Sequence, residues 1–137
     1  MTQEQKDLLL KDLCGRLTYG VKVKLGDSKP ALLTVIEHDE FGWQIGSEDE
    51  FGGMITIIDN VKPYLFPMSS MTDEDHTIYS KIWEDTGKTA YLEGCHHLIS
   101  TIKAYKAAND YLLSKHYDIN GLIPMGLAND ATGLNIY

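Results

Sequence analysis

The first residues of the chain carry a helical pattern of apolar positions. Apolar residues recur at three- and four-residue steps, and those that form the apolar face are Leu8, Leu9, Leu10 and Leu13. Thr2 followed by Gln5 is the signature of a capping box, which satisfies the first free N–H groups of a helix. Gly15 is a typical C-terminal stop. The pattern therefore predicts a helix over residues 2–14, within an N-terminal segment 1–17.

The next part of the chain, residues 18–66, has the two-residue period of strands. In residues 19–25, three apolar residues alternate with two lysines, as in a strand with one buried face. Further short apolar runs, separated by glycines and polar residues, cover 31–38, 43–46 and 54–59. We place Trp43 and Ile45 together in the core. Four short strands with tight connections predict an antiparallel SH3-like barrel or a curled sheet.

Prolines mark the end of this β-rich half. Pro63 and Pro67 lack the N–H group that a sheet ladder needs, so we expect the residues between them to be extended or 3₁₀ and to cross the end of the barrel. If Tyr64 and Phe66 were exposed beside a groove, they would suit a peptide ligand.

The last part of the chain, residues 72–137, predicts two helices and a tail. Thr72 followed by three acidic residues is a strong helix start, and the segment EDTGK at 84–88 is the expected end. Apolar residues at helical spacing predict a second helix over about 96–116, to which 91–95 could also belong. The remaining tail is rich in apolar residues, so we expect it to pack on the body. The fold class is therefore α+β, as a single domain over residues 1–137.

Composition agrees with one globular domain in a reducing compartment. The chain has 137 residues, and no apolar stretch approaches the roughly 18 residues of a membrane span. The N-terminus does not look like a secretory signal. Two cysteines, Cys14 and Cys95, form no disulfide framework, although the sequence does not tell whether they lie close together. We expect a cytoplasmic protein without a membrane partner.

Three stretches of the sequence resemble a known group of proteins. They are MTQEQKDLLLKDLCGRLTYGVKV at 1–23, VKPYLFPMSSMT at 61–72 and KHYDINGLIPMGLANDATGLNIY at 115–137. Together they are similar to a family of short uncharacterised proteins from gut Bacteroidetes and their phages and prophages. The resemblance implies a mobile-element or gut-commensal origin. It implies no activity, cofactor or catalytic residue.

Acidic residues are concentrated around a repeated tetrapeptide. Residues 38–53 read HDEFGWQIGSEDEFGG, in which DEFG occurs twice, and residues 37–50 hold six acids and no Lys or Arg, or −6 of the formal charge of −8. A strand of four to six residues would separate the two turns by about 13–20 Å, which is too far for one metal ion. We interpret them as two solvated turns. A surface for a basic partner and a metal site are the alternatives.

Cysteine and histidine residues offer weaker candidates. Cys95, His96 and His97 are zinc-type ligands, but adjacent histidines on a helix point about 100° apart and no second cluster follows. No sequence signature of a thiol enzyme surrounds either cysteine. His116, at the end of the second predicted helix, should favour a positive charge there and mark where the tail turns back.

Taken together, these patterns favour a non-enzymatic accessory or interaction protein without a cofactor. Its partner would be another protein, basic in charge, or a second copy of the chain. The net charge makes nucleic acid a poor ligand. Candidate partner-binding residues are Asp39, Glu40, Glu48, Asp49, Glu50, Tyr64 and Phe66. Three alternatives remain: an acidic nucleic-acid mimic that inhibits a DNA-binding protein, a nucleic-acid-binding small barrel, and a cryptic enzyme or metal protein that uses Cys95, His96 and His97.

Overall fold

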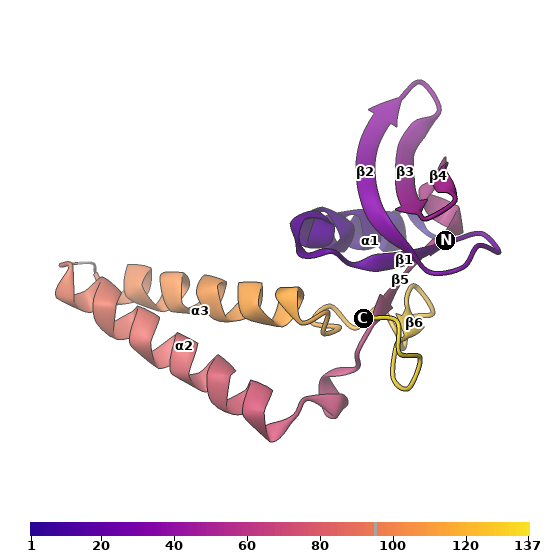
Figure 1. The fold of residues 1–137 in the computed structure, drawn as a ribbon. Helices are drawn as coiled ribbons and strands as arrows, with labels where there is room; N and C mark the ends of the chain where they lie inside the picture. The colour runs from indigo at the N-terminus through magenta and orange to yellow at the C-terminus, as the bar shows by residue number, and fades with distance from the viewer. Residues whose placement is uncertain (95) are drawn as a thin grey trace.

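The protein consists of a body and an arm. Figure 1 shows both in a computed structural model, which describes residues 1–94 and 96–137. In the body, helix α1 (Gln3–Arg16) packs against a curled sheet, and the N-terminal and C-terminal ends of the chain both lie there. In the arm, helices α2 (Asp73–Leu92) and α3 (His97–Ser114) run side by side and project away from the sheet. The predicted α+β class with a curled sheet is confirmed.

Helix α1 starts as its sequence predicts and ends later. The Gln5 amide donates to Thr2 Oγ1 at 3.2 Å, and the Thr2 amide donates to Gln5 Oε1 at 2.9 Å, so the capping box is present. Gly15 does not stop the helix, which continues to Arg16 and a 3₁₀ turn. A Cβ at Gly15 would make an ordinary van der Waals contact with Leu113 Cδ1 of α3 at 3.8 Å.

The sheet is an antiparallel meander extended by two further strands. The meander comprises β1 (Lys22–Leu25), β2 (Ala31–Asp39), β3 (Gly42–Asp49) and β4 (Gly52–Ile57), and a 3₁₀ turn at Ile58–Asn60 leads to β5 (Val61–Leu65). With the two-residue β6 (Asn129–Asp130), the order is β4-β3-β2-β1-β5-β6. Strands β4 and β6 remain as edges, so the sheet is curled and not a closed barrel.

Strand β5 corrects the prediction made from the two prolines. Pro63 lies inside the sheet, opposite Val23 of β1. The ladder with β1 covers Val61 to Pro63, and the parallel ladder with β6 begins at the next residue. Pro63 therefore has no ladder partner in β6, and its missing N–H group removes no hydrogen bond between β5 and β6. Pro67 follows the strand and precedes a 3₁₀ turn at Met68–Ser70.

The two arm helices also differ from the prediction at their shared end. Thr72 caps α2, because its Oγ1 accepts from the Asp75 amide at 3.1 Å. The predicted end at 84–88 is wrong, since Gly87 is an interior residue and α2 continues to Leu92. A turn with Gly94 at a φ of 82° follows, and His96 caps α3 by accepting from the Leu98 amide. Cys95 lies outside the described residues.

The tail packs on the body, as predicted. Leu122 and Leu127 join the hydrophobic core, and the Asp118 carboxylate accepts from the Leu122 and Ile123 amides at 2.7 and 2.9 Å. The core lies between α1, the sheet and this tail. Its buried residues are Leu9, Leu13, Val21, Val23, Leu25, Leu33, Ile45, Ile58, Val61, Leu65, Leu122, Leu127 and Ala128.

Candidate functional site

The arm leaves the sheet and returns to it at neighbouring points. After β5, the Phe66 amide donates to the His116 carbonyl oxygen at 2.9 Å, and the Asp118 amide donates to the Phe66 carbonyl oxygen at 2.8 Å. These two hydrogen bonds join the residue before the arm to the residues after it. The base of the arm is therefore fixed to the body, while its far end extends away from the sheet (Figure 1).

A single carboxylate joins the two helices at this base. Asp75, in the first turn of α2, accepts from the hydroxyls of Tyr111 and Tyr117, both at 2.6 Å. The bond from Tyr111, followed by that from Tyr117, lowers the pKa of Asp75. Burial first, and then the Asp75 carboxylate, raise the pKa of each tyrosine to about 12. Asp75 therefore stays ionised at neutral pH and holds the beginning of α2 against the end of α3.

Small side chains fill the contact between the two helices. The buried residues of the arm are Ala90, Ser100, Ala104, Ala108 and Leu112. Gly87 lies opposite Ala104, whose Cβ would be 3.7 Å from a Cβ on the glycine. Because small residues occupy the contact, the helices approach closely, and most of the large apolar side chains of α3 stay outside it.

These outer side chains form an apolar ridge on α3. Leu98, Ile102 and Tyr105 are 62%, 57% and 56% exposed, and their spacing places them on one face of the helix. We call these three residues the α3 ridge. Large apolar side chains that are this exposed and this close together are typical of interaction surfaces.

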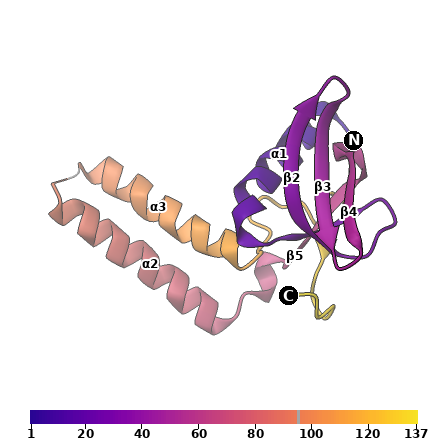
Figure 2. The same ribbon diagram turned by 45° about the horizontal axis from the view of Figure 1, so that its top comes forward.

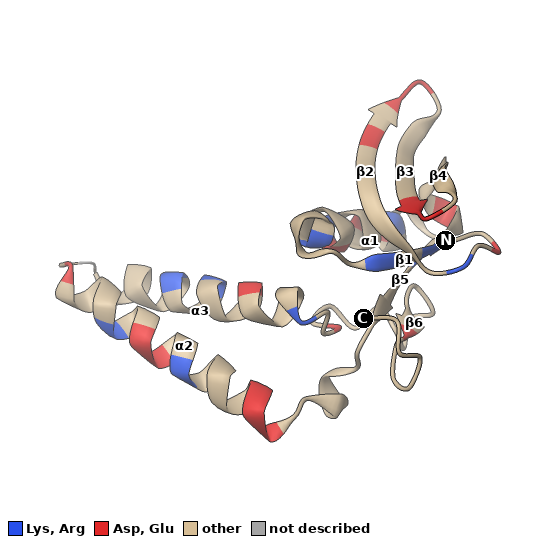
Figure 3. Ribbon diagram, viewed as in Figure 1, with Lys and Arg blue, Asp and Glu red and all other residues tan. Residues whose placement is uncertain are grey.

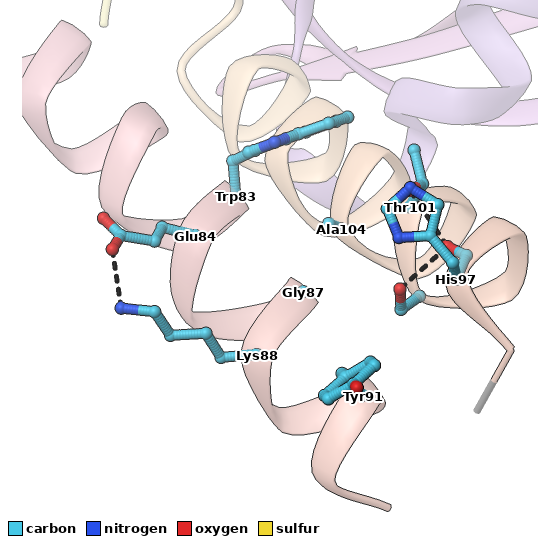
Figure 4. A pocket seen from close by; sticks show the side chains of 9 residues that line it. Trp83, Glu84, Gly87, Lys88, Tyr91, His97, Thr101 and Ala104 are labelled. Atoms are coloured by element: carbon cyan, nitrogen blue, oxygen red, sulfur yellow. Dashed lines mark hydrogen bonds and ion pairs between the residues drawn. The ribbon is translucent and has the colours of Figure 1, made fainter. Parts of the chain in front are cut away.

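A groove runs beside the ridge on the same face of the arm. It has a volume of about 370 Å³ and is lined mainly by Trp83, Gly87 and Tyr91 of α2 and by Thr101 and Ala104 of α3. Figure 4 shows the side chains of Trp83, Tyr91 and Thr101 around this hollow. The Trp83 ring meets the Tyr105 ring edge-on at 6.1 Å and so links groove to ridge. We call this hollow the arm groove.

The two helices differ in charge. Helix α2 has five acidic and two basic residues, a net charge of −3, whereas α3 has one acidic and two basic residues, a net charge of +1. Figure 3 shows this distribution along the arm. At the rim of the groove, Glu84 and Lys88 form an exposed ion pair at 2.6 Å. Three of the five acids of α2 lie in its first turn, away from the groove, so Glu84 and Asp85 are the acids of α2 that a basic residue of a partner helix would meet there.

The acidic residues singled out by the sequence lie elsewhere, in two exposed hairpin turns. Each DEFG tetrapeptide is one turn, in which the Asp carboxylate (Asp39 or Asp49) accepts from the Phe amide two residues later at 2.8 Å. Gly42 and Gly52 complete the turns with positive φ values of 105° and 131°, which favour glycine. The repeat is therefore explained by turn geometry.

The two turns lie at opposite ends of β3, as strand spacing predicts. Glu40 extends the first acidic turn, and Glu48 and Glu50 extend the second, all exposed to solvent (Figure 3). The acids do not form one continuous row. A continuous row is the arrangement that an acidic mimic of nucleic acid would need.

The aromatic candidates occupy other places than expected. Tyr64 is 8% exposed, so it offers little surface to a partner, and its carbonyl oxygen accepts from the Tyr137 hydroxyl at 2.7 Å. Phe66 is half-buried against the rings of Tyr117 and Tyr137, at the base of the arm. We expect Trp43 in the core beside Ile45, but it is 40% exposed, because it lies near the β2–β3 turn, where its ring meets His38 edge-on.

The histidine candidates are structural in this fold. His96 caps α3, and His97 borders the arm groove. His116 does not carry the charge predicted for a helix end. It is largely buried and stacked on Tyr137 at 3.9 Å, and burial, together with the nearby Arg16 charge, lowers its pKa to about 4.

Cys14 is exposed, and Cys95 falls outside the described part of the chain. Among the described residues, no three His, Cys, Asp or Glu side chains lie where they could hold one metal ion. None of the helices in that part of the chain has the length and apolar character needed to span a membrane. Comparison of the chain with family models, curated proteins and solved structures finds no match.

Proposed function

We propose that this protein is a non-enzymatic assembly protein that pairs with a second copy of itself through the arm. One observation carries the proposal: the α3 ridge and the arm groove lie side by side on one face. A two-fold axis that lies in the plane of that face would turn the two faces towards each other and place the ridge of each copy in the groove of the other. Such an interface uses the same patch twice, as in most homodimers.

Charge supports a second copy over an unrelated helix. When α3 of one copy lies along the groove of the other, its flanking lysine Lys106 approaches the acidic side of the partner's α2. The charges of α2 and α3, −3 and +1, are complementary in that arrangement. The paired arms would form a four-helix bundle, with the two bodies at its ends or sides.

The size of the surface indicates a reversible dimer. The five large apolar side chains of the face are Trp83, Tyr91, Leu98, Ile102 and Tyr105. Each is partly exposed, and burying the exposed part contributes roughly 1 kcal/mol, so ten such side chains in a dimer contribute about 10 kcal/mol. Association costs about 4–15 kcal/mol in lost freedom. At the lowest cost about 6 kcal/mol remains, so we expect a weak dimer with a Kd of tens of micromolar or above.

The test is the mass of the protein in solution. Light scattering on a sizing column, with reductant to exclude disulfides, should give an average mass between 15.4 kDa and twice that value at about 100 µM and a lower average mass on dilution. Ile102→Glu places a charge in the centre of the ridge and should give the monomer at all these concentrations. Its circular dichroism should equal that of the wild type.

Leu92→Glu is the matched control. Leu92 is 84% exposed on α2, but its helical position points away from the groove, so its replacement should leave the dimer intact. A wild-type monomer at 100 µM would contradict the proposal and leave the arm to a different protein. A dimer that survives Ile102→Glu would place the interface elsewhere.

The predicted mobile-element or gut-commensal origin fits a small assembly protein and stays a prediction. The same holds for a cytoplasmic location.

A further inference from the structure

Strand β4 is an unprotected edge of the sheet. It pairs with β3 through six consecutive residues, from Gly52 to Ile57. Within the described residues, no strand pairs with its other side, and its backbone makes no hydrogen bond outside the β3 ladder. In an antiparallel strand, alternate residues direct their N–H and C=O groups outward. Figure 2 shows β4 at this open edge.

The sequence of β4 lacks the features that normally keep an edge from pairing. Edge strands are usually protected by Lys, Pro, a bulge or short length. The β4 sequence GGMITI has no charge and no proline, and its ladder is uninterrupted. The opposite edge differs, because β6 is only two residues long. Of the two edges, β6 therefore has one of these protective features, its short length, and β4 has none of them.

Hollows on both sides of β4 could take the side chains of an added strand. On the outer face of the sheet, a hollow of about 240 Å³ lies over Gly46, between Val35 and Ile55. A Cβ at Gly46 would come within 3.1 Å of Val35 Cβ, a tight contact, so the absence of a side chain at Gly46 helps to keep this hollow open. A second hollow, of about 450 Å³, separates β4 from the turn at residues 25–28.

Acidic residues surround this edge. Glu48, Asp49 and Glu50 lie where β3 turns into β4, Asp27 faces β4 across the second hollow, and Asp59 follows the strand. Only Asp59 has a basic partner among these, Lys6 at 2.7 Å. Two copies of β4 paired antiparallel would bring Glu50 of one towards Asp59 of the other, so charge opposes self-pairing. A basic segment would meet favourable charges at the β3–β4 turn and at Asp27.

We infer that the free edge of β4 binds an extended segment of another protein in which apolar residues alternate with Lys or Arg, and that this segment adds to the sheet as a further antiparallel or parallel strand. Main-chain hydrogen bonds to β4 would give affinity, and the apolar side chains, which all point to one face of the added strand, would enter the hollow over Gly46. The Lys or Arg side chains would point to the other face, towards the hollow that Asp27 lines. The site is separate from the arm and does not depend on dimer formation.

The test uses a defined peptide and NMR. The probe is acetyl-KVKVKVK-amide, with acetyl-EVEVEVE-amide and the proline-interrupted acetyl-KVKPKVK-amide as controls. Addition of the first peptide at low salt should shift the amide signals of residues 52–57 and slow the hydrogen exchange of those that point outward. We expect a Kd below about 1 mM, weakened at least fivefold for each control peptide.

Variants locate the site. Ile55→Lys places a charge on the half-exposed Ile55 and should weaken binding at least tenfold. Glu48→Gln with Glu50→Gln should weaken it about threefold to tenfold, and the turn should stay intact because Asp49 is kept. Glu74→Gln, a loss of charge on the remote arm, should leave binding unchanged. Ile102→Glu should also leave it unchanged, so the result is independent of the arm.

Several outcomes would overturn the inference. They are no shift at 1 mM peptide, equal binding of the acidic and basic peptides, and shifts confined to residues outside β4 and its neighbours. Broad β4 signals in the protein alone that sharpen in Ile55→Lys would show that a second copy occupies the edge instead of a basic segment.

Discussion

The body and the arm are stabilised in different ways. The body has a core of large apolar residues and buries a complete ion pair. Arg16 and Asp12 are both fully buried as side chains, with Arg16 Nε 2.6 Å from Asp12 Oδ2. Arg16 Nη2 also donates to the Tyr117 carbonyl oxygen at 2.7 Å, and Asn120 donates to Asp12 Oδ1 at 2.8 Å. These bonds connect residues more than 100 positions apart.

The arm has no comparable interior. Its helices meet through alanines, a serine, a glycine and Leu112, and the large apolar side chains of Leu92, Leu98, Ile99, Ile102 and Tyr105 are exposed. Helical hairpins gain most of their stability from a buried apolar face, and here that face is open. The comparison teaches that the body buries its apolar residues within itself, whereas the arm leaves an apolar face open, to which we propose that a second copy binds. In each of the following predictions, a variant perturbs either the body or the arm.

The largest effect is expected from breaking the buried ion pair of the body. Arg16→Met would leave Asp12 buried without its charge partner, which typically costs about 3–5 kcal/mol. Urea denaturation should show this loss in the free energy of unfolding, with all regions affected because α1 and the tail both depend on Arg16. Asp12→Leu combined with Arg16→Met should recover much of it.

The matched control for this prediction is an exposed ion pair. Lys6 and Asp59 lie 2.7 Å apart and are each about one-third exposed as side chains. Lys6→Met should cost less than about 1 kcal/mol, as surface pairs do. If Arg16→Met costs no more than Lys6→Met, the buried pair does not hold the body together.

A smaller effect, confined to the arm, is expected from overfilling its helix contact. Ala104→Phe places a large side chain opposite Gly87, where a close approach leaves no room, and overpacking of this kind costs about 1–3 kcal/mol. Hydrogen exchange should become faster for amides of α2 and α3 and stay unchanged in β1 to β3. Ser100→Ala is the matched small substitution and should change little. Equal loosening of arm and body would show that they unfold as one unit.

Much of the fold follows from local patterns, and the exceptions have physical causes. The capping residues Thr2 and Thr72 and the alternation in β1 predict their elements, because these signals act within a few residues. Gly15 and Gly87 mislead as helix ends, since neither has the positive φ with which a glycine ends a helix. Pro63 misleads because a strand accepts a proline wherever the missing N–H group is not needed for pairing. Only the strand order shows that β5 is such a case at Pro63.

The candidate site was predictable only in part. The spacing of Leu98, Ile102 and Tyr105 identifies an apolar helix face, but the same spacing describes a face buried in the core. The face stays open because the arm projects from the body. Hydrogen bonds of Phe66 and Asp75 to residues far away in the sequence set this direction of the arm. The sequence predicts the acidic turns correctly, but only the strand order shows that the second of them adjoins the free edge of β4.

The smallest effect expected concerns pH and the body alone. Burial, and then the Arg16 charge, lower the pKa of His116 to about 4 from its ordinary value of 6.5, and Tyr137 stacks on the ring. Because the pKa in the folded state is the lower one, this group stabilises the fold fully above pH 6.5. The contribution is lost as pH falls towards 4, by about 1 kcal/mol at pH 5.5.

His116→Asn removes the titration and keeps the left-handed backbone, at a φ of 63°, that asparagine tolerates. Urea denaturation at pH 7.5 and 5.5 should show a smaller stability difference in the variant than in the wild type. An unchanged difference would assign the pH dependence to other groups.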